Sequence, residues 1–213
     1  MSAMRVEPGP RGRPVRTAAS AAVWPPEPMA WALGLRNPTA DYEGTRHNAG
    51  ADALREVSKQ HGALFEMDKS LGSQVSKVGL VGLALPLCWM NESALAGGPV
   101  GKRARGHGVV VVFHDDIELD PGEARLKFAG GYAGHNGLRS LGSCWGGPDF
   151  ARVRIGVGRP EKHGSGMTVA DWALSRPSME HAIGMALAFD RIGKAFPALS
   201  DGRWAEAAAI IQG

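Results

Sequence analysis

The sequence predicts a single α/β domain, with a mixed, largely parallel twisted sheet flanked by helices and a cleft at the carboxyl edge of that sheet. The run 109–113, four valines and a phenylalanine, is typical of a central strand with both faces covered. This run ends in His114, Asp115 and Asp116, at the strand edge where open α/β sheets place ligand crevices. The length of 213 residues suffices for one good core.

The composition is that of an ordinary folded domain and narrows the choice of partners. Hydrophobic residues make up 44% and charged residues 21% of the chain, both common values for globular proteins. No apolar run approaches the roughly 18 residues needed to cross a bilayer, so we expect no membrane partner. A pI near 9.1 suits an anionic partner such as RNA. Cys88 and Cys144 show no metal-binding spacing.

Residues 1–30 differ from the rest of the chain and set the expected domain boundary. They are rich in arginine and proline and show neither helical nor alternating periodicity, which predicts a disordered extension before a folded domain at 31–213. One interpretation is a transit peptide, which would place the protein in an organelle. The other is a start codon placed too early, with Met29 as the true start.

The first half of the domain predicts one strand, one helix and a hairpin. Residues 31–35 form the expected first strand, which the turn Arg36-Asn37-Pro38 closes. Asn48 is the expected N-cap of a helix that ends at 61–62. Two strands, 73–78 and 80–85, are expected to form a hairpin around Gly79.

His47 lies at the beginning of that helix, where the positive end of the helix dipole opposes protonation. We therefore expect a neutral imidazole at physiological pH, which is the form that a general base needs. The alternative is that His47, one of seven histidines in the chain, is merely exposed.

The second half predicts a basic loop, two basic strands and two helices. Residues 97–108 are rich in glycine and basic residues and read as a flexible loop. The strands 125–128 and 152–157 alternate basic with apolar residues, so their cations could bind a phosphate backbone or face solvent. Glycines around His135 and Asn136 leave room for a ligand to approach the backbone. The expected helices begin near Pro177 and at Trp204.

Four sequence pieces, taken in order, resemble the bacterial-type peptidyl-tRNA hydrolase family. They are GLRNP at 34–38, GTRHNAG at 44–50, MN at 90–91, and HDDIELDPG with GHNGLRS at 114–122 and 134–140. The resemblance extends from about Trp31 to Pro177 and includes FARVRIGVGRP at 150–160.

The resemblance implies a hydrolytic mechanism that needs neither a cofactor nor a metal. His47 matches the family's catalytic base, which removes a proton from water as the water attacks the ester between the peptide and the 3′-terminal ribose of tRNA. Asp115 matches the carboxylate that holds this histidine in its productive tautomer. The implied partner is peptidyl-tRNA, and the implied enzyme is a cytoplasmic monomer.

The resemblance also implies which residues contact the substrate. Three amides line the cleft, and Trp89 and Met90 lie near the terminal adenosine, while basic residues face the tRNA backbone. The full expected set is Asn37, Tyr42, Trp89, Met90, Asn91, His135, Asn136, Arg125, Lys127 and Arg154.

The sequence departs from the family pattern at three places. Arg36 and Thr39 replace smaller residues, so we expect a distorted turn around Asn37. Tyr132, in a loop that the family makes richer in histidine and glycine, is expected to narrow the cleft. Residues 97–108 replace an amphipathic helix of the family, which predicts a missing or irregular layer of helix packing.

Two alternatives remain beside the esterase. One is an RNA-binding protein that kept the fold and lost turnover. The other is an iron or zinc site, because two histidines and a carboxylate can bind such a metal. Its residues would be His47, His114, His135 and Asp115. Strand alternation directs the His114 side chain away from that of Asp115, which weakens the metal interpretation.

Overall fold

A computed structural model describes residues 24–213, which form a seven-stranded sheet of order β2-β3-β4-β1-β5-β7-β6. The central strands β4, β1, β5 and β7 run parallel, and antiparallel pairs close both edges. The predicted mixed, largely parallel sheet is therefore confirmed. The strands are β1 Met29–Gly34, β2 Glu66–Asp68, β3 Ser73–Val78, β4 Val81–Pro86, β5 Val109–Asp116, β6 Ala124–Phe128 and β7 Ala151–Gly156.

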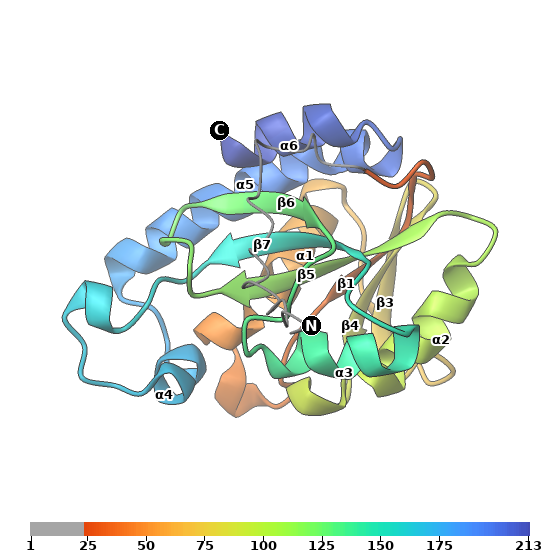
Figure 1. Ribbon diagram of the computed structural model, residues 1–213. Helices are drawn as coiled ribbons and strands as arrows, with labels where there is room; N and C mark the ends of the chain where they lie inside the picture. Colours follow the sequence, from red (N-terminus) through yellow and green to blue (C-terminus); the bar gives the residue numbers. More distant parts are fainter. Residues whose placement is uncertain (1–23) are drawn as a thin grey trace, which may run out of the picture.

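Helices cover both faces of this sheet, in three layers (Figure 1). One apolar core lies between the sheet and α1, α5 and α6, and a second lies between the sheet and α2 and α3. Within residues 24–213, no helix is both long and apolar enough to cross a membrane. The helices are α1 Ala49–Gln60, α2 Ala94–Ala104, α3 Asn136–Trp145, α4 Val169–Leu174, α5 Met179–Ser200 and α6 Trp204–Gln212. Four 3-10 turns are η1 Ala40–Tyr42, η2 Arg46–Asn48, η3 Met90–Glu92 and η4 Glu161–His163.

Strand β5 lies in the middle of the sheet, between β1 and β7, and its side chains alternate between the two cores. Val111 and Phe113 pack on the side of α1, and Val112 packs on the side of α2 and α3. Because alternate residues share a face, Asp115 follows Phe113 onto the α1 side of the sheet.

Helix α1 approaches the end of β5 closely because position 50 is a glycine. A Cβ atom on Gly50 would lie 2.1 Å from the carbonyl oxygen of Phe113, which is far inside van der Waals contact. The turn η2, immediately before α1, therefore lies at the carboxyl end of β5. This brings His47 to Asp115, which is 68 residues later in the chain.

The expectation of a flexible loop at residues 97–108 is wrong for most of that segment, because residues 94–104 form α2. Its glycines permit close packing on α3: a Cβ on Gly97 would lie 2.2 Å from Leu141 Cδ2, and one on Gly101 would lie 2.9 Å from Trp145 Nε1. The indole of Trp145 also donates to the Gly97 carbonyl at 3.0 Å. The helical layer that we expected to be missing is therefore present, and it includes Pro99.

Most other expected elements are confirmed with small shifts of their ends. Strand β1 begins at Met29 instead of Trp31, and the hairpin around Gly79 joins β3 to β4. The sequence analysis did not assign β2 or α3.

The first described residues are attached to the domain, because Trp24 stacks on Trp204 with ring centroids 6.5 Å apart. Of the segment 1–30 that we expected to be disordered, Met29 and Ala30 belong to β1, so the expectation is wrong there. Residues 1–23 lie outside the described residues, and for them disorder stays a prediction.

Candidate active site

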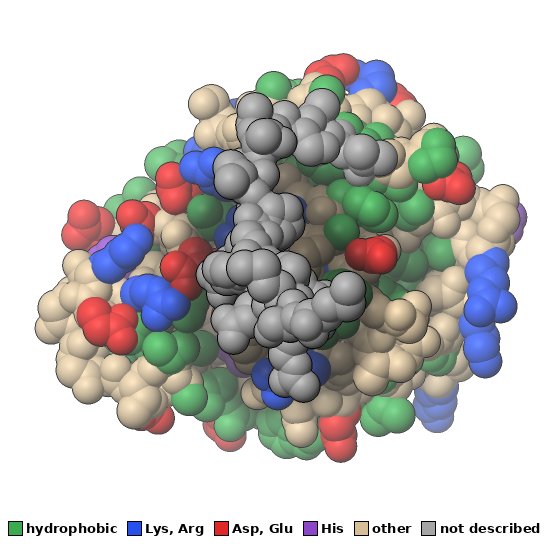
Figure 2. Space-filling view, in the orientation of Figure 1, with side chains coloured by type: hydrophobic (Ala, Val, Ile, Leu, Met, Phe, Trp, Pro, Cys, Tyr) green, Lys and Arg blue, Asp and Glu red, His purple; other side chains and the backbone are tan. Residues whose placement is uncertain are grey.

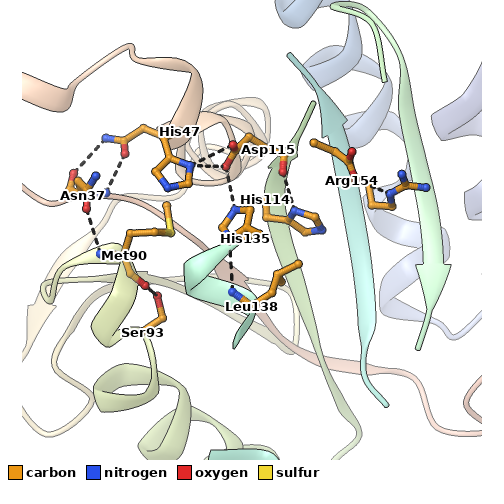
Figure 3. Close-up of polar contacts among 11 residues, drawn as sticks. Asn37, His47, Met90, Ser93, His114, Asp115, His135, Leu138 and Arg154 are labelled. Atoms are coloured by element: carbon orange, nitrogen blue, oxygen red, sulfur yellow. Dashed lines mark hydrogen bonds and ion pairs between the residues drawn. The ribbon is translucent and has the colours of Figure 1, made fainter. Parts of the chain in front are cut away.

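The candidate site is centred on a direct contact between His47 and Asp115. His47 Nδ1 lies 2.9 Å from Asp115 Oδ1 and 3.0 Å from Oδ2 (Figure 3). The carboxylate side chain is 4% exposed and the imidazole 16% exposed, so the pair is largely sheltered from water. A carboxylate can only accept, so Nδ1 carries the proton and Nε2 keeps a free lone pair. The geometry therefore fixes the tautomer that a general base requires.

The protonation of this pair follows from burial and mutual charge. Burial would raise the pKa of Asp115, but the charges of His47 and His135 and their hydrogen bonds hold it well below its usual range. Burial lowers the pKa of His47, while the charge of Asp115 and its hydrogen bond raise it, and the net pKa lies above 6.5. We expected the helix dipole to oppose protonation. The net shift of the His47 pKa is nevertheless upward, because the charge and hydrogen bond of Asp115 outweigh the effect of burial.

His135 is the second histidine on the same carboxylate. Its Nε2 lies 2.9 Å from Asp115 Oδ1, and its Nδ1 accepts a hydrogen bond from the Leu138 backbone N–H at 3.4 Å. His135 is thus the N-cap of α3. Both ring nitrogens are engaged, so this imidazole supports Asp115 and the start of α3 while its ring lines the cavity.

Three segments meet through the side chains of Asn37 and Asn48. Asn48 Oδ1 accepts from the Asn37 N–H at 2.8 Å, and its Nδ2 donates to the Asn37 carbonyl at 3.0 Å. Asn37 Oδ1 accepts from the Met90 N–H at 3.0 Å. Asn48 occupies the predicted N-cap position of α1, but its side chain makes no capping bond there. It holds Asn37 instead.

A cavity of about 580 Å³ lies over the His47–Asp115 pair and collects most of the predicted site residues. Asn136 and Asn91 lie at its wall, at the start of α3 and in η3. The predicted residues that line it are Asn37, His47, Met90, Asn91, Asp115, Lys127, His135, Asn136 and Arg154. Those that do not line it are Tyr42, Trp89 and Arg125. Tyr42 and Trp89 instead contact each other edge to face, with centroids 5.9 Å apart.

The predicted basic residues differ in their surroundings. Lys127 is exposed and lines the cavity, and Arg125, on the same exposed face of β6, lies 3.7 Å from Glu123. Arg154 is paired with Asp116, with Nε 2.6 Å from Oδ2. Part of the positive charge of Arg154 is therefore already compensated within the protein.

Arg152 has a role that the alternating pattern did not reveal. It is 2% exposed, and its two terminal nitrogens donate to the carbonyls of Gly130, Gly131 and Pro148. The guanidinium also lies over the Phe150 ring, 4.4 Å from its centroid. This arginine is a buried support of the glycine-rich loop, and the view of both basic strands as exposed stripes is wrong at this position.

The residues that differ from the family pattern have visible effects on the structure around them. Arg36 is buried, and its Nε donates to the Pro86 carbonyl at 2.8 Å, so the turn before Asn37 is attached to β4. Tyr132 lies in the cavity wall, as expected, and packs against α3 at Gly142. The next residue, Ala133, has φ +47°, a left-handed conformation that costs alanine energy.

Sequence reasoning also missed α4 as a cavity wall. This helix presents an apolar surface to the side of the cavity, formed by Val169, Ala170, Ala173 and Leu174. The available signal was only the apolar spacing before Pro177, which the glycines at 164 and 166 obscured.

His47, Asp115 and His135 offer three potential metal-ligand atoms within 4.8 Å of one another. The atoms that would bind a metal are instead hydrogen-bonded to each other, so an ion would have to displace the protons on His47 Nδ1 and His135 Nε2. His114 is not in this group, and its Nδ1 donates to the backbone carbonyl of Asp115 at 2.7 Å. Burial, with a smaller effect from His135, lowers the pKa of His114 to about 3, so this ring is neutral at physiological pH.

Comparisons with known proteins agree on one family. The family model described as peptidyl-tRNA hydrolase matches residues 32–212. A protein of that name from Bordetella avium is 36% identical over 189 residues, which cover 85% of this chain and 90% of the relative. One from Mycolicibacterium vanbaalenii is 45% identical over 139 residues, covering 63% and 72%. The crystal structure of peptidyl-tRNA hydrolase from Acinetobacter baumannii superposes with a TM-score of 0.79, at 30% identity and 87% and 95% coverage.

Proposed function

Because the chain belongs to the peptidyl-tRNA hydrolase family and hydrolyses peptidyl-tRNA, we propose that the cavity over His47 and Asp115 is its active site. The single observation that carries this proposal is the 2.9 Å contact between His47 Nδ1 and the buried carboxylate of Asp115. It leaves the other ring nitrogen free beside the cavity (Figure 3). His114 also lines the cavity as a neutral ring, but it is only 3% exposed, whereas the His47 side chain is 16% exposed.

His47 Nε2 takes a proton from a water molecule as the water oxygen attacks the ester carbonyl carbon. The bond from that carbon to the ribose 3′-oxygen then breaks. The leaving oxygen receives the proton from the imidazolium of His47, so the products are the free peptide and tRNA. Asp115 stays ionised throughout and stabilises the transient imidazolium, because its pKa is held well below its usual range.

The amides of the cavity supply donors for the ester oxygen. Asn37 Oδ1 is occupied by the Met90 N–H, so the amide is oriented with its Nδ2 group available to a substrate carbonyl. Asn91 and Asn136 add two further amides at the same cavity. Amide donors stabilise the developing oxyanion without adding a charge that would alter the pKa of His47.

The tRNA end of the substrate requires cations at the cavity mouth. Lys127 is the exposed cation in the wall, and we propose that it contacts phosphate together with Arg125 and, less strongly, Arg154. Further lysine and arginine side chains gather along the edge formed by α2 and the turn after it (Figure 2). Lys102, Arg103 and Arg105, in α2 and the turn after it, are exposed.

The decisive experiment is a single-turnover assay of peptide release from an N-acetylated aminoacyl-tRNA. We expect His47→Ala to abolish release while tRNA affinity stays nearly unchanged, because the histidine acts on water and not on the tRNA backbone. The matched control is His107→Ala, an exposed histidine before β5. A His47→Ala variant as fast as the wild type would contradict the assigned role. RNA binding without turnover is not favoured, and a wild type that binds tRNA and releases nothing would restore it.

We further propose that the reaction is independent of metal and that the enzyme acts as a cytoplasmic monomer. The hydrogen bonds that Asp115 forms with His47 and His135 support metal independence. Release should be unchanged after EDTA treatment, and sedimentation of the active protein should give a mass near 22.4 kDa. Loss of activity in EDTA that zinc or iron restores would overturn the first point.

A further inference from the structure

Arg46 precedes His47 in η2 and lies almost completely inside the protein, with 2% of its surface exposed. Its backbone N–H and one of its terminal guanidinium nitrogens donate to the residues that directly follow α4. Its backbone N–H donates to the Ser175 carbonyl at 3.0 Å. Its Nη1 donates to Ser175 Oγ and to the Arg176 carbonyl, each at 2.7 Å.

The guanidinium of Arg46 makes two further contacts, one at its edge and one on its face. Nη2 lies 3.3 Å from His181 Nδ1, at the start of α5, and the guanidinium carbon lies 3.6 Å from the centre of the Trp172 ring. Arginine suits this task because its planar group can donate at its edge and stack on its face. One side chain thus joins the turn that carries His47 to α4, Trp172 and α5.

Helix α4 needs such an attachment because it has open space on two sides. The catalytic cavity lies against Val169 and Leu174, and a second hollow of about 590 Å³ lies on the side of Trp172 and Ser175. Trp172 attaches α4 on its other side: its indole donates to the carbonyls of Val157 and Gly158, and the His163 ring stacks on it. A six-residue helix between two hollows can shift if the contacts of Arg46 are lost.

We propose that Arg46 is a positioning residue that sets the apolar wall of the cleft, against which the apolar side chain of the peptide part of the substrate packs. This inference rests on the proposed active site. The wall formed by α4 is apolar, whereas the cations Lys127 and Arg154 enter the lining from β6 and β7. An apolar wall recognises aliphatic side chains and contributes nothing to phosphate binding, so α4 faces the acyl group and the cationic wall faces the nucleotide.

The test compares two substrates on the same tRNA, one carrying N-acetyl-leucine and the other N-acetyl-glycine. In Arg46→Met, which keeps the length and apolar stem of the side chain, we expect KM for the leucyl substrate to rise about tenfold, the lower limit of what one apolar contact contributes to discrimination. KM for the glycyl substrate and kcat for both should change little, because His47 and Asp115 keep their contact. Arg46→Lys should restore part of the loss.

Hydrogen exchange provides the second readout. Backbone amides of residues 169–176 should exchange faster in Arg46→Met, and those of α1 should not. The matched control is Arg191→Met, a partly buried arginine that donates to the carbonyls of Gly122 and Ile211 away from the cavity. It should leave both KM values unchanged. Ser175→Ala removes one bond to Arg46 and provides a milder variant if Arg46→Met does not fold.

The outcomes separate this inference from the proposed active site. Unchanged KM and unchanged exchange in Arg46→Met would overturn the positioning role while hydrolysis by the wild type stands. An equal fall of kcat for both substrates would also overturn it, since Arg46 would then act on His47 and not on α4. If His47→Ala proved fully active, the active site would be wrong, and faster exchange in Arg46→Met would still report that Arg46 holds α4.

Discussion

The side-chain amide of Asn48 forms hydrogen bonds to both the N–H and the carbonyl of Asn37, at 2.8 and 3.0 Å. Two asparagines eleven positions apart are thereby locked together, and Asn37 passes the constraint on to Met90 through its own side chain. Through these hydrogen bonds, the turn that carries His47 holds Asn37, whose side chain lines the cavity.

We predict that Asn48→Ala lowers both the stability of the fold and the rate of hydrolysis. Asn48 is 1% exposed, so the change leaves two buried backbone groups of Asn37 without partners, at a cost of about 1–3 kcal/mol each. The turn that carries Asn37 should then move, and kcat should fall. Thermal unfolding and single-turnover hydrolysis measure the two effects.

The control for Asn48→Ala is Ser73→Ala, which removes another buried hydrogen bond, from Ser73 Oγ to the Leu71 carbonyl. Ser73 lies in β3 and does not line the cavity. It should cost stability without changing kcat. If Asn48→Ala lost stability but kept the wild-type kcat, the Asn37 turn would not need this support for catalysis.

Most strands of the sheet could be predicted, because the sequence patterns that indicate them are local. Five consecutive apolar residues before Asp115 define β5, and Gly79 between two alternating runs defines the hairpin. Helix α2 could not be predicted because its glycines and Pro99 have poor helix propensity, and only the approach of Leu141 and Trp145 from α3 shows why glycine is favourable there. Tertiary packing overrode the local preference.

The candidate site likewise combines residues that local patterns reveal with residues whose roles depend on distant parts of the chain. His47 and Asp115 could be predicted because one begins a helix, the other ends a strand, and both belong to specific motifs. The buried role of Arg152 could not, since its carbonyl partners come from two separate loops. Arg46 was equally hidden, because its partners lie about 130 residues away.

Lys127 and Arg125 provide a prediction about salt dependence. If each contacts a tRNA phosphate, replacing it with alanine should weaken binding and reduce the slope of log K against log salt by roughly 0.7–0.9. Lys127 lines the cavity and Arg125 lies further out beside Glu123, so Lys127→Ala should also raise KM for hydrolysis. Filter binding from low to high salt measures the slope. The control is Lys59→Ala, which removes an exposed lysine side chain of α1. An unchanged slope in Lys127→Ala would exclude a contact between Lys127 and phosphate.

Ala133 provides a prediction about strain. Its φ of +47° costs alanine about 1–2 kcal/mol, whereas glycine adopts this conformation freely but loses about 0.5–1 kcal/mol more backbone entropy on folding. We therefore expect Ala133→Gly to raise the free energy of unfolding by about 0.5–1 kcal/mol. Urea unfolding measures the change. Ala186→Gly, at an exposed position within α5, should do the opposite, and a destabilised Ala133→Gly would show that the loop is not strained at this residue.

The raised pKa of His47 predicts the pH dependence of hydrolysis. The base must be unprotonated, so kcat/KM should rise with pH through a pKa above 6.5 and then level off. In Asp115→Asn the negative charge that raises this pKa is lost, while the burial that lowers it remains. The acid limb should therefore move to lower pH, below 6.5, even though the plateau falls by about 10²–10⁴ because the tautomer is no longer fixed. Rates of both proteins, measured from acid to alkaline pH, check the lower pH of the acid limb and the lower plateau in Asp115→Asn. A plateau that falls without any shift of the acid limb would mean that the titrating group is not His47.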